Sequence, residues 1–70
     1  MHVSELRNRI KEVRARREMT QAELAAEVGV SRKTIVTVEN QIFIPSTLLA
    51  LRIARALKTS VDHLFYLADD

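Results

Sequence analysis

The stretch SRKTIVTVEN, residues 31–40, carries side chains suited to binding a polar partner. Arg32 offers five N–H donors in a planar fork and Lys33 offers a mobile ammonium, while the hydroxyl of Thr37 can donate or accept a hydrogen bond. Such groups bind anions and hydrogen-bond acceptors. They can act together only if they point the same way, so the secondary structure of this stretch matters.

By propensity alone, this stretch is a strand, because Thr34 to Val38 are all β-branched. In a helix, five such residues cost roughly 2–3 kcal/mol relative to alanine. However, no alternating partner segment or hairpin turn lies nearby. At about 100° per residue, Ile35 and Val38 would share a core-facing side of a helix. The opposite side would be polar with one valine: Arg32, Lys33, Val36, Thr37 and Asn40. We therefore expect an amphipathic helix that packing stabilises.

The remaining residues with catalytic chemistry form no comparable group. His2 stands near the chain end, and His63 is adjacent to Asp62, but neighbouring helical residues point in different directions. The sequence has no cysteine, no phosphate-binding loop and no HExxH spacing. We therefore expect no enzyme activity, no metal site and no cofactor, and interpret His63 as a helix-surface or interface residue.

Length and composition predict one small domain, residues 1–70. Apolar runs such as Leu48 to Leu51 are far shorter than a membrane span, and the N-terminus lacks a signal-peptide pattern. We expect a cytoplasmic protein without a membrane partner. Residues 1–17 hold six basic side chains against two acidic ones, although the net charge is only +2. Either that end of the molecule faces an anion or its basic residues form a solvated helix surface.

Helical spacing and capping residues predict an all-α, compact five-helix domain. Thr20 and Glu23 fit a capping box, and Gly29 fits a left-handed turn after the second helix. Ser46 and Ser60 fit the N-caps of two later helices. The expected helices cover residues 4–17, 21–28, 32–39, 47–57 and 61–66. The C-terminal tail, residues 66–70, could contribute a short strand.

The stretch TQAELAAEVGVSRKTIVTVEN resembles the helix-turn-helix of the phage repressor/Cro-like, or Xre-type, family of DNA-binding transcriptional regulators. The family pattern places a small residue four positions before a turn glycine, here Ala25 and Gly29. Apolar residues follow at the positions of Ile35 and Val38. A small Ala25 permits a close helix crossing, and Gly29 permits the turn. The motif covers residues 20–40, and the order TQ, VS, EN, PS, ALRIARAL and SVDHLF extends the resemblance to short single-domain members across nearly the whole chain.

By this resemblance, residues 31–39 form the recognition helix, which enters the major groove of double-stranded DNA. The expected base contacts are Arg32, Lys33, Val36 and Thr37. The two basic residues could instead contact only phosphates. The expected phosphate contacts are Gln21, Ser31, Asn40 and Ser46. The family also commonly links an arginine of the first helix to the glutamate that ends the third, which implies a partly buried structural ion pair between Arg14 and Glu39.

The chain departs from the family pattern in its turns and in its apolar surface. Relatives often have glycine at the positions of Glu18, Gln41 and Lys58, so these positions predict backbone strain or a different turn. Relatives also tend to be polar at the positions of Ile42, Ile44 and Leu48. The additional apolar residues predict a two-fold homodimer. Its expected interface residues are Leu48, Leu64, Phe65, Tyr66 and Leu67. Alternatively, Tyr66 lies over the core of its own chain.

The resemblance implies a sequence-specific regulator, a repressor that binds a palindromic operator as a homodimer. The alternative is a protein-interaction module or antitoxin-type partner protein that uses the apolar residues 42–48. An acidic recognition surface would favour this alternative, and the one expected here is basic. No small-molecule ligand is evident, because 70 residues leave little room for a ligand-binding domain.

Overall fold

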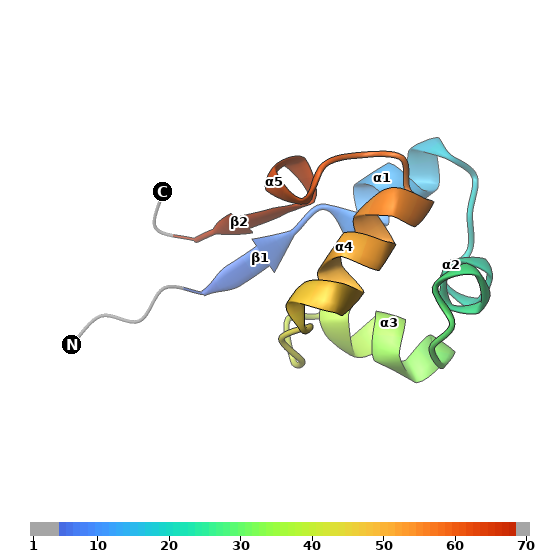
Figure 1. Cartoon of the computed structure of the whole chain (residues 1–70), viewed down its shortest axis with the longest axis horizontal. Helices are drawn as coiled ribbons and strands as arrows, with labels where there is room; N and C mark the ends of the chain where they lie inside the picture. The colour runs from blue at the N-terminus through green and yellow to red at the C-terminus, as the bar shows by residue number, and fades with distance from the viewer. Residues whose placement is uncertain (1–4, 69–70) are drawn as a thin grey trace.

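The computed structural model describes residues 5–68, which form five helices and one two-stranded sheet (Figure 1). The elements in chain order are β1 (Leu6–Asn8), α1 (Ile10–Arg16), α2 (Gln21–Val28), α3 (Arg32–Glu39), α4 (Thr47–Ala56), α5 (Val61–Leu64) and β2 (Phe65–Leu67). The expected five-helix, mostly helical fold is confirmed, and α2 and α3 have the expected bounds. Within residues 5–68, every helix is too short or too polar to cross a membrane.

The expected first helix, residues 4–17, is wrong at its start. Leu6–Asn8 form β1, which pairs antiparallel with β2 and places Leu6 opposite Leu67. Helix α1 begins only at Ile10, whose backbone N–H donates to the side chain of Asn8 at 3.2 Å. The pairing with β2 gives this segment hydrogen-bond partners from the far end of the sequence, so its helical spacing is not realised. Residue 4 lies outside the described residues.

The expected last helix, residues 61–66, is too long. Helix α5 ends at Leu64, because Phe65 has an extended backbone, with φ −117° and ψ 141°, and begins β2. The short C-terminal strand expected as an alternative is present. Helix α4 ends at Ala56, one residue before the expected end, and Leu57 caps it.

The core collects apolar side chains from all five helices and from β2. It contains Ile10, Val13, Leu24, Ala25, Val28, Ile35, Val38, Ile53, Ala54, Leu57, Leu64 and Phe65. Leu64 is 0% exposed and Phe65 is 9% exposed. These two expected interface residues therefore pack inside their own chain, because the end of α5 and the start of β2 are part of the core.

A residue with the left-handed backbone conformation lies just after the end of each of the helices α1, α2, α3 and α4. Gly29 has φ 86° and ends α2, where its N–H donates to the Ala25 carbonyl at 2.9 Å. Glu18, Gln41 and Lys58 have φ of 52°, 63° and 53°. These three are the positions at which strain is expected from the sequence, because a side chain crowds the backbone in this conformation.

Replacing Lys58 with glycine should raise the free energy of unfolding by about 0.5–1 kcal/mol. The left-handed conformation costs a residue with a Cβ about 1–2 kcal/mol, and the greater freedom of glycine in the unfolded chain offsets part of this gain. The measurement is urea denaturation at neutral pH. As the matched control, Gly29→Ala should lower stability through backbone strain alone, because a Cβ there meets no atom within 4 Å. Equal stability of Lys58→Gly and the parent would contradict the prediction.

Candidate nucleic-acid interface

Side-chain caps position the two helices of the helix-turn-helix. At α2, Thr20 Oγ1 accepts the N–H of Glu23 at 3.0 Å, and Glu23 Oε1 accepts the N–H of Thr20 at 2.8 Å. At α3, Ser31 Oγ accepts the N–H of Thr34 at 3.2 Å. These bonds satisfy N–H groups that have no partner within the helix, and they define where each helix begins.

Because of the capping box, the free energy of unfolding should depend on pH. The pKa of Glu23 is lowered, first by the hydrogen bond from the Thr20 backbone and then by the one with its side chain. A carboxyl with a lowered folded-state pKa stabilises the fold above its unfolded-state pKa, and this contribution is lost as pH falls through the folded-state value. Glu23→Gln should therefore flatten the decline of the urea midpoint below about pH 4.5. Glu27→Gln is the exposed control on the same helix, and an identical flattening in both variants would contradict the assignment.

Helix α3 presents the expected two sides. Ile35 and Val38 are buried, whereas Arg32 and Lys33 are exposed at the first turn. Val36 and Thr37, the other expected base contacts, are half-buried. Thr37 Oγ1 donates its proton to the Thr34 carbonyl at 2.9 Å. Toward a partner, this residue therefore offers an acceptor oxygen and a methyl group rather than a donor.

A continuous hydrogen-bond network joins α1, α2 and α3. Arg14 Nε lies 2.9 Å from Glu39 Oε2, and the two side chains are only 14% and 5% exposed. Gln21 Nε2 donates to Glu39 Oε1 at 3.2 Å, and Gln21 Oε1 accepts from Arg32 Nη2 at 3.1 Å. The buried pair therefore orients the Gln21 amide, which in turn contacts the exposed arginine of α3. This network will be called the Arg14–Arg32 relay; the family resemblance implied the ion pair, but nothing in the sequence indicated its extension to Arg32.

The side chains expected to contact phosphates differ in which hydrogen-bond donors remain free. Ser31 and Ser46 use their oxygens as caps, the latter for the N–H of Leu49 at 3.1 Å, and Ser46 keeps its hydroxyl proton for a partner. Ser31 also lies 3.0 Å from the Thr34 hydroxyl, where either oxygen can donate. Asn40 is exposed at the end of α3. In contrast, both ends of the Gln21 amide are engaged in the relay.

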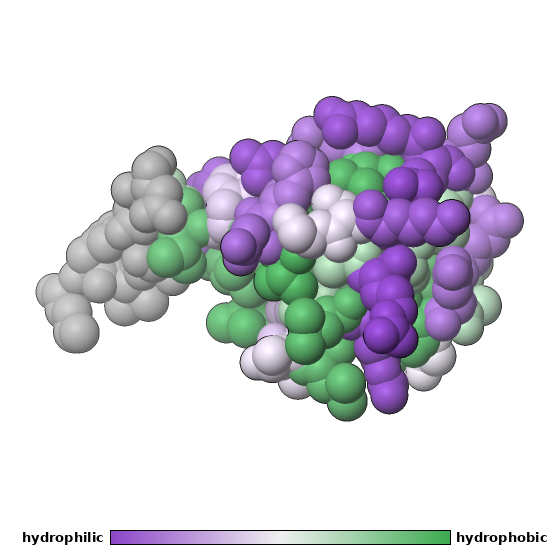
Figure 2. All heavy atoms as spheres, turned by 45° about the horizontal axis from the view of Figure 1, so that its top comes forward, coloured by the Kyte–Doolittle hydropathy of each residue, from purple (hydrophilic) through white to green (hydrophobic). Residues whose placement is uncertain are grey.

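Apolar side chains surround the end of α3. Ile42 and Ile44, in the connection to α4, are 75% and 72% exposed, and Leu48 is also exposed. Lys33, Thr34 and Thr37 of α3 share a shallow depression of about 310 Å³ with Ile42 and Phe43. Figure 2 shows hydrophobic side chains gathered over one part of the surface and bordered by hydrophilic ones.

The expected dimer residues do not form one surface. Leu48, Tyr66 and Leu67 are exposed, whereas the other two are in the core described above. The Arg9 guanidinium lies over the Tyr66 ring, 4.2 Å from the ring centroid. Arg9 also donates to the His63 carbonyl at 3.0 Å. The His63 backbone therefore links α5 to Arg9, the residue between β1 and α1, while the His63 side chain is exposed.

Among residues 5–68, no three histidine or acidic side chains are close enough to hold a metal ion. The described residues instead combine a basic first turn on α3, the hydrogen-bond network that holds Arg32, and the capped N-termini of α2 and α4. Such a surface presents donors to base edges and to phosphates.

The same organisation occurs in known proteins. Residues 10–64 match the helix-turn-helix family model. The chain is 37% identical over 65 residues to YgzD of Bacillus subtilis, an uncharacterized HTH-type transcriptional regulator, covering 93% of this chain and 98% of that protein. It is 46% identical over 65 residues to an uncharacterized HTH-type transcriptional regulator of Archaeoglobus fulgidus, covering 93% of each chain. A crystal structure of a Bacteroides fragilis protein that has been proposed to bind DNA superposes with a TM-score of 0.79 at 30% identity, covering 87% of this chain and 98% of that one. The chain therefore belongs to the Xre-type helix-turn-helix family of DNA-binding transcriptional regulators.

Proposed function

We propose that the protein is a cytoplasmic repressor that binds a palindromic operator as a homodimer. The Arg14–Arg32 relay is the observation that carries this proposal, because it attaches an exposed base-reading side chain to the core. Each copy places α3 in the major groove, where Arg32 and Lys33 donate to guanine and Val36 and Thr37 offer methyl groups to thymine. Ser31, Ser46 and Asn40 contact phosphates, and Gln21 either supports Arg32 or turns to the backbone.

Two copies related by a two-fold axis would read half-sites about one helical turn, roughly 34 Å, apart. The exposed Leu48, Tyr66 and Leu67 supply the contact between the copies in this proposal. Leu64 and Phe65 support that surface from within the core and do not touch the second copy. Occupation of a promoter by such a dimer blocks transcription.

The test is selection of bound duplexes from a random pool, followed by sedimentation of the protein alone and with the selected DNA. We expect a palindromic consensus and two chains per duplex. Leu67→Glu should shift the free protein to the monomer mass, because an apolar contact would then have to bury a charge. Ala26→Glu, on the exposed side of α2, is the matched control. Failure to enrich any sequence would refute specific binding, and an unchanged mass of Leu67→Glu would refute this interface.

A second candidate function is a protein-interaction module that uses residues 42–48. The high exposure of Ile42 and Ile44 favours it, because side chains of this kind are usually covered in a working complex. A stoichiometric protein complex that Ile44→Asp abolishes, formed by a chain with no salt-dependent DNA binding, would place this candidate first.

A further inference from the structure

The connection from α3 to α4 is held against the end of α3 by backbone hydrogen bonds (Figure 1). The N–H of Ile42 donates to the Thr37 carbonyl at 2.9 Å, and the N–H of Phe43 donates to the same oxygen at 3.2 Å. Gln41, whose φ of 63° is left-handed, donates its own N–H to the Val38 carbonyl at 3.1 Å. This bonding pattern is that of a Schellman motif, which fixes where the connection leaves the helix.

The shallow depression of about 310 Å³ beside α3 lies between the helix and this connection, and will be called the α3–α4 depression. Ile42 and Phe43 line it from the connection, and they are 75% and 47% exposed. From the helix it is lined by Thr34 and by two expected base contacts, Lys33 and Thr37. Accessible apolar side chains therefore lie next to the residues that would read DNA.

The hydroxyl groups of the α3–α4 depression already have partners within the helix-turn-helix. Thr37 Oγ1 donates to the Thr34 carbonyl at 2.9 Å, and the Thr34 hydroxyl lies 3.0 Å from that of Ser31. The accessible lining is mostly apolar. A phosphate placed there would lose water and gain few donors in return, whereas an apolar group pays no such cost.

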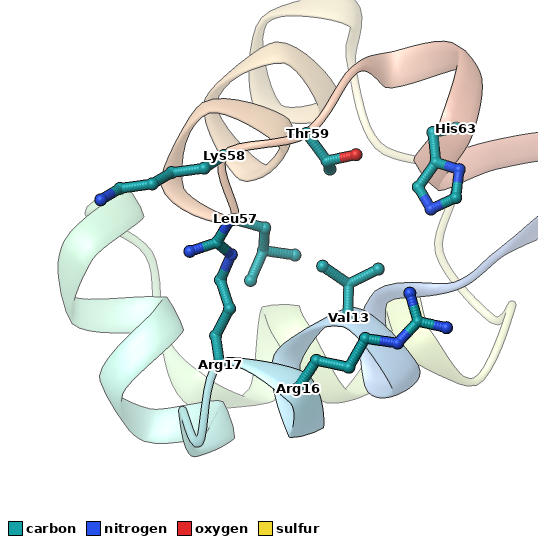
Figure 3. Close-up of a pocket in the computed structure, with 7 residues that line it drawn as sticks. All are labelled: Val13, Arg16, Arg17, Leu57, Lys58, Thr59 and His63. Atoms are coloured by element: carbon teal, nitrogen blue, oxygen red, sulfur yellow. The ribbon is translucent and has the colours of Figure 1, made fainter.

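The depression between the end of α1 and the α4–α5 connection differs in this respect (Figure 3). Its apolar lining residues Val13 and Leu57 are only 7% and 0% exposed, so they offer almost no surface to a ligand. Figure 3 shows the guanidinium groups of Arg16 and Arg17 at opposite ends of that depression, so they do not converge on one ligand.

We propose that the α3–α4 depression receives the 5-methyl group of a thymine in the major groove. Ile42 and Phe43 are then specificity-determining residues that lie outside the recognition helix. This inference rests on the proposed DNA-binding function. Apolar side chains, phenylalanine among them, distinguish thymine through its methyl group, which projects into the major groove. A shallow depression suits this group, because a stacked base presents only its edge to the protein.

The test removes single methyl groups from an operator that has been selected from a random pool. Each thymine is replaced in turn with deoxyuridine, which lacks only the 5-methyl group. We expect a thymine in each half-site at which this replacement weakens binding by the parent protein about fourfold, as expected for one buried methyl group. At that position, the double variant Ile42→Ala with Phe43→Ala should bind the thymine and deoxyuridine operators almost equally.

Two further variants separate this contact from a general loss of apolar surface or of folding. Ile44→Ala is the matched control, because Ile44 is 72% exposed on the same connection but does not line the depression. It should keep the full difference between the two operators. Ile42→Ala alone changes the most exposed lining side chain and should reduce the difference in part. Circular dichroism checks that each variant retains the helices of the parent.

Several results would overturn the proposal while leaving specific DNA binding intact. One is a selected operator on which no deoxyuridine replacement affects the parent. Another is a difference that persists in the double variant but disappears in Val36→Ala, because α3 would then make the methyl contact. A lower mass of the double variant in sedimentation, with an unchanged deoxyuridine difference, would assign both side chains to a protein contact. Failure to select any sequence would refute specific binding itself, and this inference with it.

Discussion

Replacing Glu39 with alanine should lower the free energy of unfolding by about 3–5 kcal/mol, because it leaves Arg14 largely buried without its partner. The guanidinium would retain one recorded acceptor, the Met19 carbonyl at 2.9 Å. A 70-residue domain has a total stability of roughly 4–10 kcal/mol, so this loss would leave the variant partly unfolded at physiological temperature. Urea denaturation, followed by circular dichroism, measures the effect. Glu27→Ala, an exposed glutamate on α2, should change stability little.

A double replacement separates the stability of the pair from its role in the relay. Arg14→Met with Glu39→Leu should recover most of the lost stability, since apolar side chains of similar size tolerate this buried site. The same variant should bind operator DNA with reduced discrimination, because Gln21 Nε2 loses its carboxylate acceptor and no longer orients Arg32. Recovery of both stability and full discrimination would show that the relay does not position the recognition side chain.

Arg32→Ala should reduce discrimination between the selected operator and a random duplex by about 5- to 150-fold, which corresponds to the 1–3 kcal/mol of a bidentate base contact. Non-specific affinity should fall far less, because only one positive charge is removed. Competition titrations at a single salt concentration measure both quantities. Thermal stability should be almost unchanged, since Arg32 is exposed.

Lys11→Ala provides the matched control for Arg32→Ala, because it removes one exposed basic side chain from α1 rather than α3. We expect it to leave discrimination unchanged. If Arg32→Ala instead weakened binding uniformly for all sequences and lowered the salt dependence by about one ion, Arg32 would be a phosphate contact only. In that case, Lys33, Val36 and Thr37 would be the residues that contact the bases.

The local signals in the sequence predicted the helix-turn-helix well. Thr20, Ser31 and Ser46 each cap the helix that follows, and Gly29 has the left-handed conformation expected of it. These features depend on a few neighbouring residues, so they can be read without knowing the fold. The β-branched stretch from Thr34 to Val38 also forms a helix, because burial of its apolar side outweighs the propensity for a strand.

The features that depend on distant contacts were not predictable in the same way. Leu6–Asn8 is only three residues long and has no alternating pattern. Its sequence therefore does not indicate a strand as long as the pairing with β2 is unknown. For Phe65, Tyr66 and Leu67, the sequence predicts that some face outward, but the strand geometry decides which. The link from Gln21 to Arg32 depends on side-chain conformations at a helix crossing, which residue spacing does not specify.

The antiparallel pairing of β1 with β2 brings the first and the last strand of the described residues side by side. Leu6 lies opposite Leu67, so the first and last described segments are adjacent although nearly the whole sequence separates them. A short peptide linker from β2 to β1, combined with a new opening in the exposed connection at residues 41–44, should give a circularly permuted protein with the same helices. Its chain would begin and end beside α3, at the proposed DNA surface, where an added domain could report directly on DNA binding.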